Sequence, residues 1–217
     1  MTYSVTLAEI ESSLLKAARA TGLHWGIAEE AGKAARWLAA FALPGPEITL
    51  AQLRQLEGKD YRSFIPDCKL KPWQAKSGIL CPFIAGAAIA DRSAQMLGGI
   101  QFDLGRTAFP LLLAATVGQA ARCHRRVFTT SWAGVRVSCF EHGLSIDGNG
   151  DDLLLGEVDA VSCREDSLPA PQRLPSTRAY QVDRETWESI DRLAFKTYAP
   201  ATEASRAGAG AGLTDND

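Results

Sequence analysis

The spacing of apolar residues changes near Val127, and this change constrains the fold more than any other feature of the sequence. Before that point, apolar side chains recur every three or four residues, which is the period of an amphipathic helix. From Val127 to Phe140 they alternate instead, which is the period of a half-buried strand. Helical segments followed by short strands and a last helix predict the α+β class, with a small, mainly antiparallel sheet.

Two long helices are predicted at the start of the chain. Thr6 and Glu9 form a capping-box pair, and the helix that begins there is expected to run to Gly22. A second helix is expected over residues 25–42, because the Pro-Gly-Pro sequence at residues 44–46 ends it. The connection between the two helices is short, which favours an antiparallel pair.

Thr49 and Gln52 repeat the capping-box pattern and predict a short helix that ends at Leu56. The elements expected beyond it are a loop over residues 59–77, a helix or buried strand beginning at Pro82, a buried helix after Pro110, a hairpin of residues 127–132 and 135–140, strands at residues 144–146, 158–163 and near Tyr180, and a helix capped by Asp183. We expect a single domain over residues 1–217, with a helical part (1–58), a buried helical part (78–125), an antiparallel sheet (126–182), and a helix with a tail (183–217).

Composition excludes several classes of function. The formal net charge is −2, which gives no overall electrostatic attraction to nucleic acid. The longest uncharged apolar run is too short to cross a bilayer, and the N-terminus lacks the pattern of a secretory signal. The five cysteines are widely spaced and never form a CxxC pair, so we expect reduced thiols in a cytoplasmic protein.

Basic residues cluster twice, and we interpret both clusters as solvated faces. Lys69, Lys71 and Lys76 surround Trp73, and a second group occupies residues 122–126. Either group would suit a nucleic-acid surface, but the chain as a whole is acidic.

Metal and thiol chemistry have weak signals. Asp147, Asn149 and Asp151 match the first ligands of a calcium loop, but the required glycine and final glutamate are missing, so a turn is favoured. The Cys and His residues at 123, 124, 139 and 142 lack the pairing of structural zinc sites. Cys81 precedes a helix start, which would lower its pKa, although a buried structural cysteine is favoured. We therefore predict no metal and name no cofactor.

The C-terminal tail differs from the rest of the chain, because it has no apolar periodicity. Ser205 and Arg206 precede a Gly/Ala run at residues 207–212, and Asp215 and Asp217 follow. Such a segment is either a loose end or an anion site, in which glycine amides converge and an arginine adds a permanent charge.

Four runs of the sequence resemble a bacterial family of unknown function, the proteins that carry domain of unknown function 3726 (DUF3726). The runs are LAEIESSLLKAARATGLHWGIAEEAGKAARWLAA, LCPFIAGAAIADR, PLLLAATVGQAA and TYAPATEASRAGAGAGLTDND. The resemblance implies no activity. It does include HWGIAEEAGKAARW and SRAGAGAGLTDND, which a fold alone would not require.

These observations lead to one main hypothesis, a cytoplasmic protein that binds a small polar or anionic metabolite, and they leave open whether it is an enzyme. The site is expected where the tail meets the second helix and the residues after Pro82. In this hypothesis Arg206 holds a carboxylate or phosphate, and one acidic residue handles a proton. The catalytic candidates are Glu29, Glu30 and Asp91, and the ligand-binding candidates are Trp25, Arg92, Ser205, Arg206, Asp215 and Asp217. The same glutamates could instead pair with Lys33 on a solvated helix face.

The alternative hypothesis is not enzymatic. It describes an accessory subunit or homo-oligomer whose tail docks on a partner protein. Neither hypothesis involves nucleic acid or a membrane.

Overall fold

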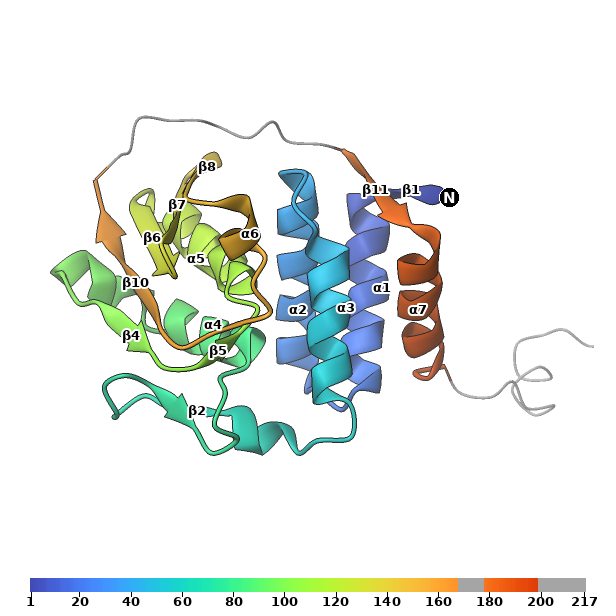
Figure 1. The fold of residues 1–217 in the computed structure, drawn as a ribbon, viewed down its shortest axis with the longest axis horizontal. Helices are drawn as coiled ribbons and strands as arrows, with labels where there is room; N and C mark the ends of the chain where they lie inside the picture. Colours follow the sequence, from blue (N-terminus) through green and yellow to red (C-terminus); the bar gives the residue numbers. More distant parts are fainter. Residues whose placement is uncertain (168–177, 199–217) are drawn as a thin grey trace, which may run out of the picture.

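In the part of the chain that the computed structural model describes, residues 1–167 and 178–198, four helices from both ends of the chain pack side by side (Figure 1). The first three are α1 (Leu7–Ala20), α2 (Trp25–Ala40) and α3 (Gly45–Leu56). The fourth, α7 (Arg184–Phe195), contacts α1 and α3. The predicted packing of the first two helices against each other is therefore present.

Side-chain caps fix where two of these helices begin, as predicted. Thr6 donates its backbone N–H to Glu9 Oε2 over 2.7 Å, and its Oγ1 accepts the Glu9 N–H over 3.2 Å. These hydrogen bonds stabilise the charged form and so lower the pKa of the Glu9 carboxyl. Asp183 Oδ2 accepts the backbone N–H groups of Glu185 and Thr186 over 2.9 and 3.3 Å at the start of α7.

The start of the third helix was predicted wrongly. α3 begins at Gly45, with Pro46 in its first turn, so Thr49 and Gln52 lie inside the helix rather than at its cap. Both side chains are buried, and neither Thr49 Oγ1 nor Gln52 Oε1 has a hydrogen-bond partner within the described residues. The spacing of Thr49 and Gln52 therefore matches a capping box, but the two side chains do not cap the helix.

A two-stranded antiparallel sheet joins the two ends of the described chain. β1 (Thr2–Thr6) pairs with β11 (Ala179–Asp183), so that Val5 lies opposite Tyr180. The strand near Tyr180 was predicted and β1 was not. Because α1 follows β1 and α7 follows β11, the antiparallel register places the starts of the two helices at opposite ends of this ladder, and the helices themselves lie side by side (Figure 1).

The second layer is a five-stranded sheet in the order β4-β10-β6-β7-β8. Its antiparallel hairpin, β6 (Val127–Trp132) and β7 (Val135–Phe140), has the predicted bounds. Ala133 (φ 42°) and Gly134 (φ 81°) form its turn, and two positive φ values are what a type I′ turn requires. The other strands are β4 (Phe102–Leu104), β8 (Gly143–Asp147) and β10 (Val161–Asp166).

A buried helix, α5 (Leu111–His124), lies between the sheet and the helical group, because it contacts β6 and β7 as well as α2. The segment that begins at Pro82, predicted as either a helix or a buried strand, is a helix, α4 (Pro82–Ala90), next to α5. Together with the sheet, these elements confirm the α+β class. In the described residues, no helix is long and apolar enough to span a membrane.

The segment predicted as a loop, residues 59–77, has short regular elements. A 3-10 turn, η1 (Tyr61–Phe64), leads into the small hairpin of β2 (Pro66–Asp67) and β3 (Gln74–Ala75). The remaining short elements are η2 (Ser93–Gly98), β5 (Thr107–Ala108), α6 (Gly150–Leu153) and β9 (Glu157–Val158).

Candidate functional site

A cationic cavity of about 460 Å³ lies where the β2–β3 loop meets η2 and β4. We call it the Arg92 pocket. Three stretches of chain that are distant in sequence line it: Cys68, Lys69, Lys71 and Trp73; Arg92 and Gln95; and Ile100, Gln101, Phe102 and Asp103. Its volume lies within the range of small-molecule sites in proteins.

The β2–β3 loop is held against β4 through its backbone. Trp73 donates its N–H to the carbonyl of Asp103 over 2.8 Å, and its own carbonyl accepts the N–H of Gly105 over 2.9 Å. The Trp73 ring is 5% exposed and packs against the ring of Phe102, with 5.1 Å between the ring centroids. These contacts make the loop one rigid wall of the pocket.

The loop comes close to the backbone of Gly105. A Cβ atom at Gly105 would lie 3.1 Å from the carbonyl oxygen of Trp73, which is tighter than ordinary van der Waals contact.

Three cations line the pocket, and none of them forms an ion pair within the described residues. Arg92 is fixed, because its Nη1 donates to the carbonyl of Ala88 over 3.1 Å and its guanidinium lies 6.0 Å from the centre of the Trp73 ring. Lys69 and Lys71 are exposed and form no ion pair within residues 1–167 and 178–198. With Asp103 as the one acidic side chain among the lining residues, the lining carries a formal charge of +2. The whole chain, in contrast, carries −2.

The polar groups of the pocket suit binding more than covalent chemistry. Gln101 Nε2 donates to Asp103 Oδ1 over 2.6 Å, which leaves Asp103 Oδ2 available. Burial raises the pKa of the Cys68 thiol, so this thiol is protonated at neutral pH and is a poor nucleophile. None of the lining residues is a histidine.

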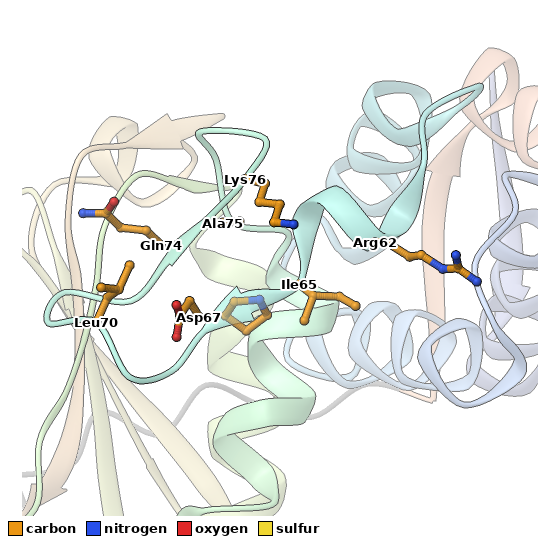
Figure 2. Close-up of a pocket in the computed structure, with 8 residues that line it drawn as sticks. Arg62, Ile65, Asp67, Leu70, Gln74, Ala75 and Lys76 are labelled. Atoms are coloured by element: carbon orange, nitrogen blue, oxygen red, sulfur yellow. The ribbon is translucent and has the colours of Figure 1, made fainter.

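A second cavity, of about 570 Å³, lies on the other side of the β2–β3 hairpin (Figure 2). Asp67, Leu70 and Gln74 project from the hairpin, whereas Arg62 points away from Asp67 (Figure 2). Asp67 Oδ1 already accepts the backbone N–H of Lys69 over 3.0 Å. Because its charged groups do not converge, this cavity is the weaker candidate.

Of the predicted site residues in the described part of the chain, only Arg92 lines the Arg92 pocket. Trp25 is 63% exposed at the start of α2, where the guanidinium of Arg19 lies 4.8 Å from its ring centre. Glu30 forms an ion pair with Lys33 over 2.8 Å, in agreement with the alternative of a solvated helix face.

Glu29 is exposed on the same helix, and Asp91 is exposed at the C-terminal end of α4. Neither of them lines the pocket. The tail residues Ser205, Arg206, Asp215 and Asp217 lie outside the described residues, so the tail site and the docking of the tail on a partner stay predictions.

The structure also places the residues that were weighed for thiol and metal chemistry. Cys81 is fully buried, and burial raises its pKa to about 11, so the alternative of a lowered pKa was wrong. Asn149 Oδ1 caps α6 by accepting the backbone N–H of Asp151 over 3.2 Å. In the described part of the chain, no three His, Cys, Asp or Glu residues are grouped so that they could hold a metal ion.

Sequence reasoning noticed the two lysines of the pocket but assigned them to a solvated face. The signal that could have separated them from ordinary surface lysines is Trp73, an aromatic residue within a basic loop. Its burial shows that the loop packs on the body of the protein.

One family model matches the chain. It is described as "Protein of unknown function (DUF3726)" and covers residues 5–78, which include α1 to α3 and the loop that supplies Lys69 and Lys71. No curated protein and no solved structure matches the chain. Over residues 5–78 the resemblance predicted from the sequence is confirmed, and this segment is similar to a family of unknown function. It contains the first of the four runs that suggested the resemblance, and the other three runs lie outside the matched residues.

Proposed function

We propose that this protein binds a small anionic metabolite in the Arg92 pocket, through a carboxylate or phosphate group of the ligand. The observation that carries the proposal is the convergence of Lys69, Lys71 and Arg92 on one cavity of an otherwise acidic chain. Unpaired cations beside a concave surface attract anions, and the surrounding protein strengthens that attraction relative to bulk water.

The three cations have complementary roles. The guanidinium of Arg92 is held by Ala88 and Trp73, so it presents its remaining N–H donors without a large loss of side-chain entropy. Lys69 and Lys71 are exposed and can adjust to the anion from the loop. The amide of Gln95 adds a neutral donor on the η2 side.

The lining supports binding and supplies no activated nucleophile, so the proposal assigns no reaction. The ligand is small, because the cavity of about 460 Å³ accommodates a metabolite rather than a folded segment.

Charge reversal at Lys69 tests the proposal, because this exposed side chain can be changed without disturbing the core. The matched control is Lys76→Glu, since Lys76 is also exposed on the β2–β3 hairpin but lines the other cavity. The binding of inorganic phosphate and of citrate is measured by isothermal titration calorimetry at an ionic strength of about 0.1 M, where the Debye length is about 10 Å. Lys69→Glu should weaken binding by about tenfold or more, because hydrogen bonds to charged groups contribute about 1.5–3 kcal/mol each.

Lys76→Glu, which makes the same change in net charge, should alter the affinity by about twofold at most, because added salt and distance screen its charge. Equal losses in the two variants would mean that only the net charge matters and would refute a localised site. Failure of the unmodified protein to bind either anion would refute the proposal outright.

A further inference from the structure

A third cavity, of about 440 Å³, adjoins the Arg92 pocket and differs from it in chemistry. Lys71 and Asp103 line both cavities, so these two side chains form a shared wall. On the far side of the wall, the polar groups are the hydroxyls of Ser131 and Ser162. We call this second cavity the serine chamber.

The register of the sheet explains why these groups lie together. Asp103 of β4 is opposite Ser162 of β10, and Ser162 is opposite Ser131 of β6. Directly opposite residues of antiparallel strands have Cβ atoms about 4.5–5.5 Å apart and point to the same face. One carboxylate and two hydroxyls therefore form a straight row across three neighbouring strands.

The members of this row have unused hydrogen-bonding capacity. Neither Ser131 nor Ser162 makes a side-chain hydrogen bond within the described residues, and both are half-buried rather than fully exposed. Asp103 Oδ2 is also available, since Gln101 occupies only Oδ1. The strand neighbours Leu104 and Val161 also line the chamber, but they are buried, because alternation along the strands turns their side chains to the opposite face of the sheet.

A carboxylate and hydroxyls at such spacing suit a ligand that carries several hydroxyl groups. A sugar hydroxyl donates to the carboxylate, and serine hydroxyls both donate and accept. A nucleobase fits less well, because Trp73 and Phe102 are 5% and 4% exposed and offer no open ring face for stacking.

We propose that the ligand of this protein is a phosphorylated sugar, with its phosphate in the Arg92 pocket and its hydroxyl-bearing part in the serine chamber. This inference rests on the proposed anion binding and specifies the ligand class. The shared wall orients the ligand, because Lys71 attracts the phosphate whereas Asp103 repels it and accepts hydroxyls.

The test compares three probes, inorganic phosphate, glucose 6-phosphate and glucose, by isothermal titration calorimetry. On the unmodified protein, glucose 6-phosphate should bind about tenfold or more tightly than phosphate, because two or more additional hydrogen bonds form. The double variant Ser131→Ala/Ser162→Ala should lose this difference while its affinity for phosphate changes by about twofold at most.

Ser145→Ala is the matched control, because Ser145 lies on the same face of the sheet, opposite Ser138 in β7, but does not line the chamber. Its affinity for glucose 6-phosphate should equal that of the unmodified protein. Circular dichroism checks the fold of each variant, and Ser162→Ala alone replaces the double variant if the latter is unfolded.

The outcomes separate the two proposals. If phosphate and glucose 6-phosphate bind equally well, or if the serine variants keep the preference for the sugar, the phosphorylated sugar is refuted while anion binding stands. If neither phosphate nor glucose 6-phosphate binds, both proposals are refuted. Binding of glucose as tightly as glucose 6-phosphate would also refute the role of the Arg92 pocket.

Discussion

Gly32→Ala should destabilise the protein, although alanine is the better helix former. Gly32 lies in α2 where this helix contacts α1, and a Cβ atom added there would lie 2.6 Å from the carbonyl oxygen of Glu11. It would also lie 3.3 Å from Leu15 Cβ and from the Leu15 backbone nitrogen. Because the closest of these atoms belongs to the backbone, a side-chain rotation cannot relieve the clash, and the two helices must move apart.

The magnitude follows from two opposing terms. Overpacking of a tight interface costs about 1–3 kcal/mol, whereas replacing glycine by alanine in a helix gains about 0.8–1 kcal/mol. The clash at 2.6 Å puts Gly32 toward the upper part of the first range, so a net loss of about 1–2 kcal/mol is expected. For a chain of 217 residues, this corresponds to a fall of about 2–8 °C in Tm.

Gly26→Ala in the same helix is the matched control. No atom lies within 4 Å of a Cβ built at Gly26, so only the helix-propensity gain applies and Tm should rise slightly. Both variants are compared with the unmodified protein by thermal and urea unfolding followed by circular dichroism. An unchanged or raised Tm for Gly32→Ala would refute the reasoning, because it would show that α1 and α2 have room for the methyl group.

Two further predictions concern titratable groups. With a thiol reagent at pH 8, exposed Cys123 should react first, whereas the buried thiols of Cys81, Cys139 and Cys163 should react only after unfolding. Equal reaction rates for all thiols in the native protein would contradict this burial. Burial raises the pKa of the Glu47 carboxyl, to which Tyr180 donates a hydrogen bond of 3.2 Å. A raised folded-state pKa means that the contribution of Glu47 to stability is fully present below its ordinary value of 4.5 and is lost as pH rises through the folded-state pKa. Glu47→Gln removes this loss, so the substitution should stabilise the protein more at pH 7 than at pH 4, as measured by urea unfolding. Equal effects of the substitution at both pH values would contradict the raised pKa of Glu47.

The elements that sequence reasoning predicted correctly are those specified by local chemistry. The hairpin turn at Ala133 and Gly134 needs only two residues with positive φ between alternating strands. Thr6 and Asp183 cap their helices through bonds to residues two or three positions away. All of this information lies within a few residues of sequence.

Thr49 shows where local chemistry fails. Its spacing to Gln52 imitates the Thr6–Glu9 cap, yet both side chains are buried within α3, which Pro46 has already started. A capping pattern cannot report whether its residues face solvent or a neighbouring helix, because that depends on contacts with distant parts of the chain.

The candidate site was predicted only in part for the same reason. Arg92 was selected as a ligand-binding residue, but Lys69 and Lys71 were assigned to a solvated face. The two lysines and Arg92 line one cavity because Trp73 is attached to β4. The backbone hydrogen bond from Trp73 to Asp103 makes this attachment, and it joins residues about thirty positions apart in the sequence. β4 itself is only three residues long and was not predicted. A strand this short leaves too few alternating positions to be recognised.

The absence of ion pairs around the two lysines is the physical link between the fold and the proposed function. The acidic side chains of the loop and the pocket form hydrogen bonds rather than ion pairs with these lysines, since Asp67 accepts the backbone N–H of Lys69 and Asp103 accepts the amide N–H of Gln101. The described fold therefore holds three cations around one cavity that has a single acidic side chain, Asp103, and this excess of positive charge costs repulsion energy in the unliganded protein. A bound anion removes that repulsion, and any ligand that binds only the folded state also stabilises it. The proposed anion binding therefore predicts a gain in thermal stability on adding the anion, because both would follow from one arrangement of charges.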